Sequence, residues 1–181
     1  MLILASASPR RRDLLAAAGV ACVVDAADID ETPRPNEAAS AYAERLAREK
    51  AAVVAARHPD CSVLGADTVV VVDGEIFGKP IDGDDARRML RRLSGRAHVV
   101  MTAVAVACNT DIRSSVENAV VEMRTISENE LNAYVQSGEP LDKAGAYAIQ
   151  GGAGTFICRV SGDLDTIVGL PVKLALKLLN D

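Results

Sequence analysis

Near the middle of the chain, a single aspartate interrupts a run of apolar residues. The run covers positions 63–72, and the aspartate is Asp67. A carboxylate within a buried strand is unfavourable unless it is paired. Such a group is suited to binding a divalent metal or to acting as a general base. A salt bridge to Lys50 or Lys79 is the structural alternative, and Thr68 taken alone is an ordinary strand residue.

A second charge lies where the pattern predicts apolar side chains. Asn36 can cap a long helix that ends at His58. On a helical wheel, Lys50 falls in the middle of the apolar arc that includes Tyr42 and Leu46. A bare ammonium on a buried face is costly. Lys50 therefore reaches the rim of the face, pairs with an acid, or marks an anion-lined cleft at the end of the helix.

The amino-terminal run that contains Ser8, Arg10 and Arg11 combines a helix start with two arginines. The first turn of a helix favours an anion through its dipole and its free backbone N–H groups, and guanidinium groups bind phosphate oxygens bidentately. Ser8 either caps the helix or donates its hydroxyl to a phosphate, and Arg12 is predicted to be exposed. The run predicts a phosphate-binding site.

Three further residues are candidates only in combination with the residues above, because none of them has a distinctive pattern of its own. Lys79 lies in a turn between Gly78 and Pro80, where a lysine is usually only exposed, and Glu31 lies in the acidic loop at positions 25–35. Gln150 stands between apolar residues and glycines, and an amide in such a place can read the edge of a base through paired donor and acceptor groups.

The elements that must position these residues follow from apolar periodicity and turn signals. We expect strands at positions 1–5, 20–24, 61–66 (continuing at 69–72), 75–77, 98–107 and 115–126. We expect helices at 9–19, 36–58 and 84–93, a helix from the capping box at 127–130 to Gly138, and a final helix opened by Pro171. Asp73-Gly74 predicts one hairpin turn and Asn109-Thr110 another. The alternation predicts an α/β fold with a mixed, twisted sheet flanked by helices.

Composition limits the partners and the location. The chain has 181 residues, a net charge of −5 and 49% hydrophobic residues, so we expect one domain, residues 1–181, with two lobes around a cleft. A negative net charge argues against a broad nucleic-acid surface. The sequence contains no run of about 18 apolar residues, so no membrane span is predicted. The amino end does not resemble a signal peptide. The four cysteines are far apart, which is typical of buried thiols in a reducing cytosol.

These pieces together resemble the Maf family of nucleotide pyrophosphatases, and the resemblance runs over nearly the whole chain. In the amino-terminal half it is carried by the segments at positions 4–11, 46–51, 64–68, 78–80 and 93–95. In the carboxyl-terminal half it is carried by the segments at 137–147, 149–151 and 168–171. Their order and spacing agree with the family pattern throughout.

The resemblance implies a fold similar to that of inosine triphosphatases, often assembled as a homodimer. It implies hydrolysis of a nucleoside triphosphate to the monophosphate and pyrophosphate, with a divalent metal cation, Mg²⁺ or Mn²⁺. Asp67 matches the catalytic acid/base of the family, and Asp67 and Glu31 match metal-site acids. The phosphate-site positions are matched by Ser8, Arg10, Lys50 and Lys79.

Substrate choice in the family is linked to three positions, which are Arg11, Thr68 and Gln150 in this chain. That set resembles the branch that acts on dTTP and UTP. The branch that acts on 7-methyl-GTP carries a tryptophan before the arginine and a glutamate in place of Gln150, and neither is present here. The chain departs from the family pattern at positions 162–167, where a serine followed by aromatic or amide residues is usual.

Two other functions are compatible with the same residues. One is a pyrophosphatase for damaged purine triphosphates. The other is a nucleotide-binding regulator of cell division and septum formation with weak catalysis. The buried carboxylate of Asp67 favours an enzyme, because a protein that only binds polyanions has little use for a carboxylate in its binding site.

Overall fold

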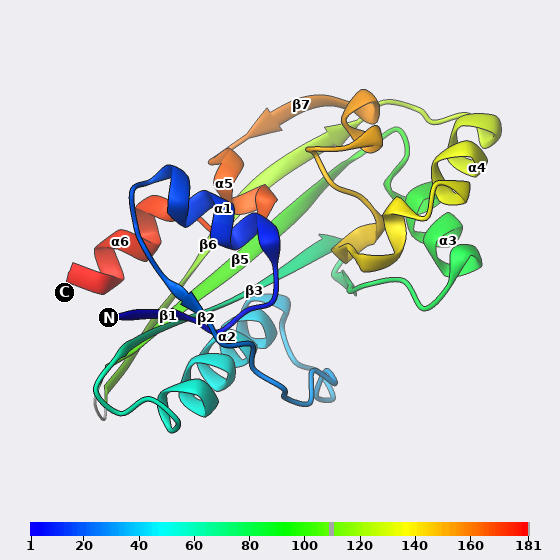
Figure 1. The fold of residues 1–181 in the computed structure, drawn as a ribbon. Coiled ribbons are helices and arrows are strands. Elements are labelled where there is room, and N and C mark those ends of the chain that lie inside the picture. Colours follow the sequence, from blue (N-terminus) through cyan, green and yellow to red (C-terminus); the bar gives the residue numbers. More distant parts are fainter. Residues whose placement is uncertain (109–110, 181) are drawn as a thin grey trace. The chain divides into compact units, whose positions relative to one another are not determined.

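The computed structural model describes residues 1–108 and 111–180, and its centre is a mixed seven-stranded sheet (Figure 1). The strand order is β2-β1-β3-β5-β6-β7, with β4 paired to β3. The strands are β1 (Leu2–Leu4), β2 (Val23–Val24), β3 (Ser62–Val72), β4 (Glu75–Phe77), β5 (Ala97–Cys108), β6 (Asp111–Met123) and β7 (Ile157–Ser161). Strand β1 is parallel to its neighbours β2 and β3. Strand β4 is antiparallel to β3, and β7 is antiparallel to β6. The predicted α/β fold with a mixed sheet is confirmed.

The helices follow the predicted order, with one addition. They are α1 (Pro9–Ala17), α2 (Ala39–Ala55), α3 (Gly83–Leu93), α4 (Glu128–Gln136), α5 (Leu164–Val168) and α6 (Val172–Asn180). Short 3₁₀ helices cover Glu139–Asp142, Ala144–Ala146 and Gly152–Phe156. Helix α5 was not predicted, and it occupies the stretch that departs from the family pattern. None of the helices in the described residues is long and apolar enough to span a membrane.

Two local signals were read correctly from the sequence. Ser127 and Glu130 form a reciprocal capping box at the start of α4. Asp73 and Gly74, with φ of 51° and 78°, make the tight turn between β3 and β4. The turn predicted at Asn109-Thr110 lies outside the described residues, and the strands before and after it, β5 and β6, are neighbours in the sheet.

The predicted cap of the long helix was wrong. Helix α2 begins at Ala39, with Ala38 in the cap position. Asn36 instead lies in a turn that is closed by a hydrogen bond of 3.1 Å from the Glu37 N–H to the Arg34 carbonyl, and it adopts φ of 57°. Asparagine tolerates this left-handed conformation better than most residues, so the signal marked a turn and not a helix start.

The chain separates into two compact units, and each is built from several segments. The first contains residues 1–68, 102–108, 111–117 and 169–180, and the second contains residues 69–101 and 118–168. The apolar core of the second unit combines α3 and α4 with the aromatic residues Phe77, Tyr134 and Phe156. The expectation of a single domain over residues 1–181 stays a prediction.

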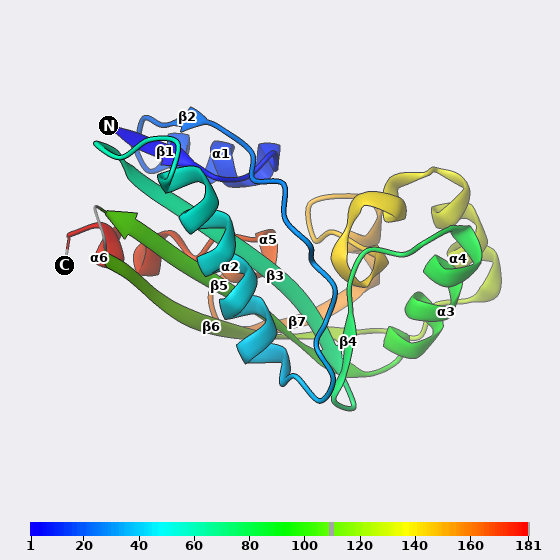
Figure 2. The ribbon, with the colours of Figure 1, turned by 90° about the horizontal axis from the view of Figure 1, so that it is seen from below.

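In the first unit, the two faces of β3 are covered by different helices. Successive side chains of a strand point to opposite faces. Leu64 and Ala66 pack in one cluster with Leu15 of α1 and Leu178 of α6. Gly65 lies on the other face, directly against α2, and Figure 2 shows α2 running beside β3. The strand therefore presents alternate residues to α1 and α6 on one face and to α2 on the other.

The close contact between α2 and β3 requires a glycine at position 65. A Cβ atom built there would lie 2.8 Å from the Ala51 backbone nitrogen and would collide with the Ala47 carbonyl oxygen. Both are backbone atoms of α2, so they cannot turn away as a side chain would. The contact sets how near the α2 side chains come to those that follow Gly65 on β3.

We predict that Gly65→Ala destabilises the fold by at least about 1–3 kcal/mol, because the methyl group forces α2 away from β3. Urea unfolding at neutral pH measures the change. Gly78→Ala is the matched control, since nothing lies within 4 Å of a Cβ at that position. Equal stability of the two variants would contradict the close packing described.

Candidate active site

Asp67 lies on β3 beyond the point where β1 and β2 end. Leu4, the last residue of β1, pairs with Leu64, so β3 continues past its neighbour by several residues. The loops that leave the carboxyl ends of β1 and β2 carry Ser6 and Glu31 to this part of the strand. Ligand sites in open α/β sheets commonly lie at the carboxyl ends of parallel strands.

The Asp67 carboxylate is buried and paired with one lysine. Asp67 is 7% exposed, and Lys50 Nζ donates a hydrogen bond of 2.7 Å to its Oδ1 atom. Burial raises the pKa of Asp67 above its ordinary value, while the positive charges of Lys50 and Arg11 oppose that shift. Of the two salt bridges considered from the sequence, the one to Lys50 is observed.

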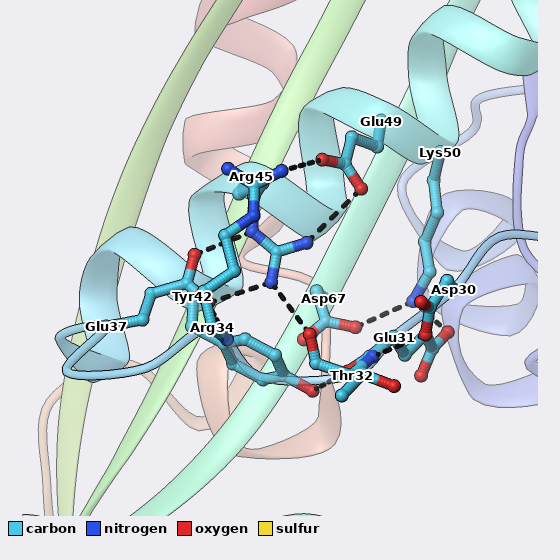
Figure 3. A network of polar contacts seen from close by, with 10 residues as sticks. All are labelled: Asp30, Glu31, Thr32, Arg34, Glu37, Tyr42, Arg45, Glu49, Lys50 and Asp67. Atoms are coloured by element: carbon cyan, nitrogen blue, oxygen red, sulfur yellow. Dashed lines mark hydrogen bonds and ion pairs between the residues drawn. The ribbon is translucent and has the colours of Figure 1, made fainter.

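Lys50 lies between two carboxylates. It projects from α2 and is 8% exposed, and its Nζ atom is 2.7 Å from Glu31 Oε1 as well as 2.7 Å from Asp67 Oδ1 (Figure 3). The lysine on the apolar face of the predicted helix thus pairs with acids. The two carboxylates come from different elements, β3 and the loop after β2, and one ammonium group joins them.

The opposite face of β3 carries the arginine of α1. The Arg11 guanidinium donates three hydrogen bonds, from Nε to the Gly169 carbonyl (2.8 Å), from Nη1 to Ser6 Oγ (3.0 Å) and from Nη2 to Thr68 Oγ1 (3.2 Å). Thr68 Oγ1 also lies 2.9 Å from Thr102 Oγ1. Burial lowers the pKa of Arg11, and the negative charge of Asp67 partly offsets this. Arg11 and Thr68, two predicted specificity residues, are therefore in direct contact.

The start of α1 differs in one detail from the prediction. Ser8 occupies the cap position and Pro9 the first helical position, but the Ser8 side chain makes no capping hydrogen bond. The Ser8 N–H donates to Ser6 Oγ at 3.2 Å. Arg10 follows in the first turn and is half-buried. Capping therefore does not account for the Ser8 hydroxyl.

The predicted site residues divide between the two units. The first unit holds most of them, namely Ser8, Arg10, Arg11, Glu31, Lys50, Asp67 and Thr68. Lys79 and Gln150 belong to the second unit, and both are exposed there. The direct contacts join Lys50 to Asp67 and Glu31, and Arg11 to Thr68.

The turn after Gln150 is held by a residue that the sequence analysis missed. The Glu139 carboxylate accepts hydrogen bonds from the Gly152 N–H and from the Tyr134 hydroxyl, both at 3.1 Å. A Cβ atom at Gly151 would collide with the same carboxylate. The glycines beside Gln150 thus allow the backbone to approach Glu139. The two glycines were visible in the sequence, but nothing there indicated that Glu139, twelve residues before Gly151, is their partner.

Tyr42 and Ser6 were also missed as site residues. The Tyr42 hydroxyl donates to the Glu31 carbonyl at 2.7 Å, and Ser6 Oγ accepts from Arg11. Tyr42 reads as an ordinary member of the apolar arc, because its ring is indeed buried and only its hydroxyl reaches the loop. A serine directly after a buried strand was the available signal for Ser6.

The carboxylates at this site suit a cation that takes some of its ligands from the protein and the others from a substrate. Within the described parts of the chain, no group of three or more His, Cys, Asp or Glu side chains could hold a metal ion. Mg²⁺ usually keeps several waters and binds one or two protein carboxylates together with substrate phosphates. Asp67 and Glu31, which converge on Lys50 Nζ, supply that number of carboxylates.

Comparisons with known proteins give one consistent result. The model of a family described as "Maf-like protein" matches residues 1–181. A "dTTP/UTP pyrophosphatase" of Myxococcus xanthus is 53% identical over 99% of this chain and 91% of its own length. Proteins with the same name from Hahella chejuensis and Escherichia coli O157:H7 are 52% and 48% identical, over 99% of this chain and 91% and 92% of their own lengths.

Among solved structures, a HAM1 protein from Coxiella burnetii covers 99% of this chain and 98% of its own. The two are 16% identical with a TM-score of 0.48.

We predict that Lys50→Met lowers the free energy of unfolding by about 3–5 kcal/mol, because it leaves the buried Asp67 carboxylate without its cation. Urea unfolding at neutral pH measures the loss. Arg48→Met is the matched control, since Arg48 lies on the same helix and is exposed. Adding Asp67→Asn to Lys50→Met should restore much of the stability, and a double variant no more stable than Lys50→Met would refute the explanation.

Proposed function

This chain belongs to the family of Maf-like proteins, and we propose that it is a nucleoside triphosphate pyrophosphatase that acts on dTTP and UTP. The structural observation that carries the proposal is the buried Asp67 carboxylate, held by Lys50 at the carboxyl ends of parallel strands. Relatives named dTTP/UTP pyrophosphatase that are 46–53% identical over 99% of the chain support the activity and the substrate class.

In the proposed reaction, Asp67 orients a water molecule and accepts a proton from it. The water oxygen attacks the α-phosphorus, the bond from that phosphorus to the bridging oxygen breaks, and pyrophosphate leaves. A carboxylate with a raised pKa is a stronger base than an ordinary aspartate, and burial raises the pKa of Asp67. Lys50 holds one carboxylate oxygen and so fixes the orientation of the group.

Positive charge for the triphosphate comes from the start of α1 and from the two lysines. We assign Ser8, Arg10, Lys50 and Lys79 to phosphate binding. Asp67 and Glu31 would hold a divalent cation, Mg²⁺ or Mn²⁺, which when bound neutralises phosphate oxygens and the leaving pyrophosphate. Lys50 Nζ has three N–H donors, so it could keep its bond to Asp67 and also donate to a phosphate oxygen.

Specificity is assigned to Arg11, Thr68 and Gln150. Arg11 binds Thr68 directly, so a change at either position alters the other. Gln150 offers both a donor and an acceptor to a pyrimidine edge. A homodimer remains a prediction from the resemblance, and a cytoplasmic location remains a prediction from the cysteine spacing and the amino end.

We predict that Asp67→Asn lowers the rate of pyrophosphate release from dTTP by about 10²–10⁴-fold while dTTP still binds, because the amide cannot accept the proton. A coupled pyrophosphate assay and a binding titration measure the two effects. Asp60→Asn, at an exposed aspartate, is the matched control. Turnover near the wild-type rate in Asp67→Asn would refute the role of Asp67, and a wild-type protein without turnover on any triphosphate would favour the regulator.

We predict that Gln150→Glu lowers kcat/KM for dTTP and UTP by about 10-fold or more, because a carboxylate replaces the amide donor with a negatively charged acceptor. Pyrophosphate release across a panel of canonical and damaged triphosphates measures the profile, and Gln136→Glu, at an exposed position on α4, is the control. A wild-type preference for ITP over dTTP and UTP would instead support a pyrophosphatase for damaged purine nucleotides.

A further inference from the structure

The loop between β2 and α2 has no regular secondary structure, yet it places Glu31 against Lys50. The Glu31 side chain is 52% exposed, so little packing holds it. Its carboxylate nevertheless lies 2.7 Å from Lys50 Nζ. A single exposed ion pair contributes little to holding a loop. The position of Glu31 therefore depends on other contacts of the same loop.

One of these contacts is made by Tyr42 to the backbone of Glu31 itself. The Tyr42 hydroxyl donates a hydrogen bond of 2.7 Å to the Glu31 carbonyl oxygen (Figure 3). Tyr42 is 8% exposed, so its ring is fixed on α2. A tyrosine hydroxyl is ordinarily protonated at neutral pH, so it can donate to this carbonyl oxygen.

Arg45, one turn further along α2, holds the rest of the loop. Its guanidinium donates to the two Glu37 carboxylate oxygens at 2.6 and 2.8 Å and to the Thr32 carbonyl at 3.3 Å. It also lies over the Tyr42 ring, 5.5 Å from the centroid. The Glu37 carboxylate accepts the Arg34 N–H as well, and these bonds lower the pKa of Glu37 to about 2. The Glu37 carboxylate and the Arg45 guanidinium are therefore both charged at neutral pH.

Apart from the bond between Arg34 and Glu37 within the loop, these contacts start from the helix that also carries Lys50. Tyr42, Arg45 and Lys50 lie within nine consecutive residues of α2, so one rigid element fixes both the loop and the ammonium group. The loop contacts begin at the Glu31 carbonyl and end at the Glu37 carboxylate. Glu31 is thus held by its own backbone on one side and by the anchored segment Thr32–Glu37 on the other.

We propose that Tyr42 and Arg45 are positioning residues, which hold the Glu31 carboxylate toward Asp67 and thereby complete the divalent-cation site of the proposed function. Neither side chain needs to touch the cation or the substrate. Tyr42 acts through the Glu31 carbonyl, and Arg45 acts through Glu37 and Thr32. The inference rests on the proposed function for the role of the cation, but it can be tested without turnover.

The test is a double-mutant cycle on Tyr42→Phe and Glu31→Gln, read as Mn²⁺ affinity by titration calorimetry without nucleotide. Phenylalanine keeps the ring under Arg45 and removes only the hydroxyl. Loss of a group that orients a metal ligand typically weakens binding 10–100-fold. We expect Tyr42→Phe to weaken Mn²⁺ binding by about 10-fold, and the double variant to bind no more weakly than Glu31→Gln.

Tyr147→Phe is the matched control. It also removes a hydroxyl from a buried ring, where the Tyr147 oxygen lies 2.6 Å from His98 Nε2 in the second unit. A merely structural loss would appear in this variant too. We expect it to retain wild-type Mn²⁺ affinity.

Arg45 gives a second test through its conservative variant. Arg45→Lys keeps a positive charge beside Glu37 but loses the two-pronged contact, so its Mn²⁺ affinity should lie between those of the wild type and Arg45→Met. In steady-state assays with dTTP, the variants should need more Mn²⁺ for half-maximal rate, and kcat at saturating Mn²⁺ should recover toward the wild-type value.

The outcomes separate the inference from the proposed function. Wild-type Mn²⁺ affinity in Tyr42→Phe, or losses that simply add in the double variant, would overturn the positioning role, and so would a wild-type protein that binds no Mn²⁺. A coupled loss of Mn²⁺ affinity in a protein that hydrolyses neither dTTP nor UTP would support the positioning role and reject the proposed function.

Discussion

The contact of Lys50 with two carboxylates is the interaction that the rest of the site depends on. An ammonium on a buried helix face and a carboxylate in a buried strand are each unfavourable alone, and here each stabilises the other across 2.7 Å. The contact is possible because Gly65 lets α2 approach β3 closely. Glu31, from a loop with little packing of its own, lies at the same point, 2.7 Å from Lys50 Nζ. Charge that would destabilise a core is thus concentrated where three elements meet.

The alternation of β3 then divides the site between two faces. Asp67 points toward α2 and its lysine, and the next residue, Thr68, points toward α1 and Arg11. In the proposed function these two neighbouring residues serve different tasks, a carboxylate for acid–base chemistry and a hydroxyl for recognition. Because β1 and β2 end before this point, the loops that follow them supply Ser6 and Glu31.

Much of the fold could be predicted from apolar periodicity and turn signals, and two of the candidate residues were marked by a charge within an apolar run. Asp67 and Lys50 were found in this way. The sequence could not decide whether Asp67 pairs with Lys50 or with Lys79, because periodicity shows which face of an element a residue lies on and not how far apart two side chains are. Asn36 was misread because a residue that favours caps also favours left-handed turns. Glu139 was missed because its role depends on how closely the backbone at Gly151 and Gly152 folds back onto its carboxylate, which residue patterns do not indicate.

The balance of charge explains why the loop contacts of α2 matter for the proposed reaction. Asp67 and Glu31 together outweigh Lys50 by one negative charge, and a nucleoside triphosphate adds several more. Two arginines at the start of α1 offset part of that excess, and a divalent cation held by Asp67 and Glu31 would offset more of it. One of them, Asp67, is fixed by its strand and by burial. The other, Glu31, is exposed, and what fixes it is the hydroxyl of Tyr42 and the fork of Arg45. Asp67 is held by a rigid strand, whereas Glu31 is held by a loop. The geometry of the site therefore depends on the contacts that hold this loop in place.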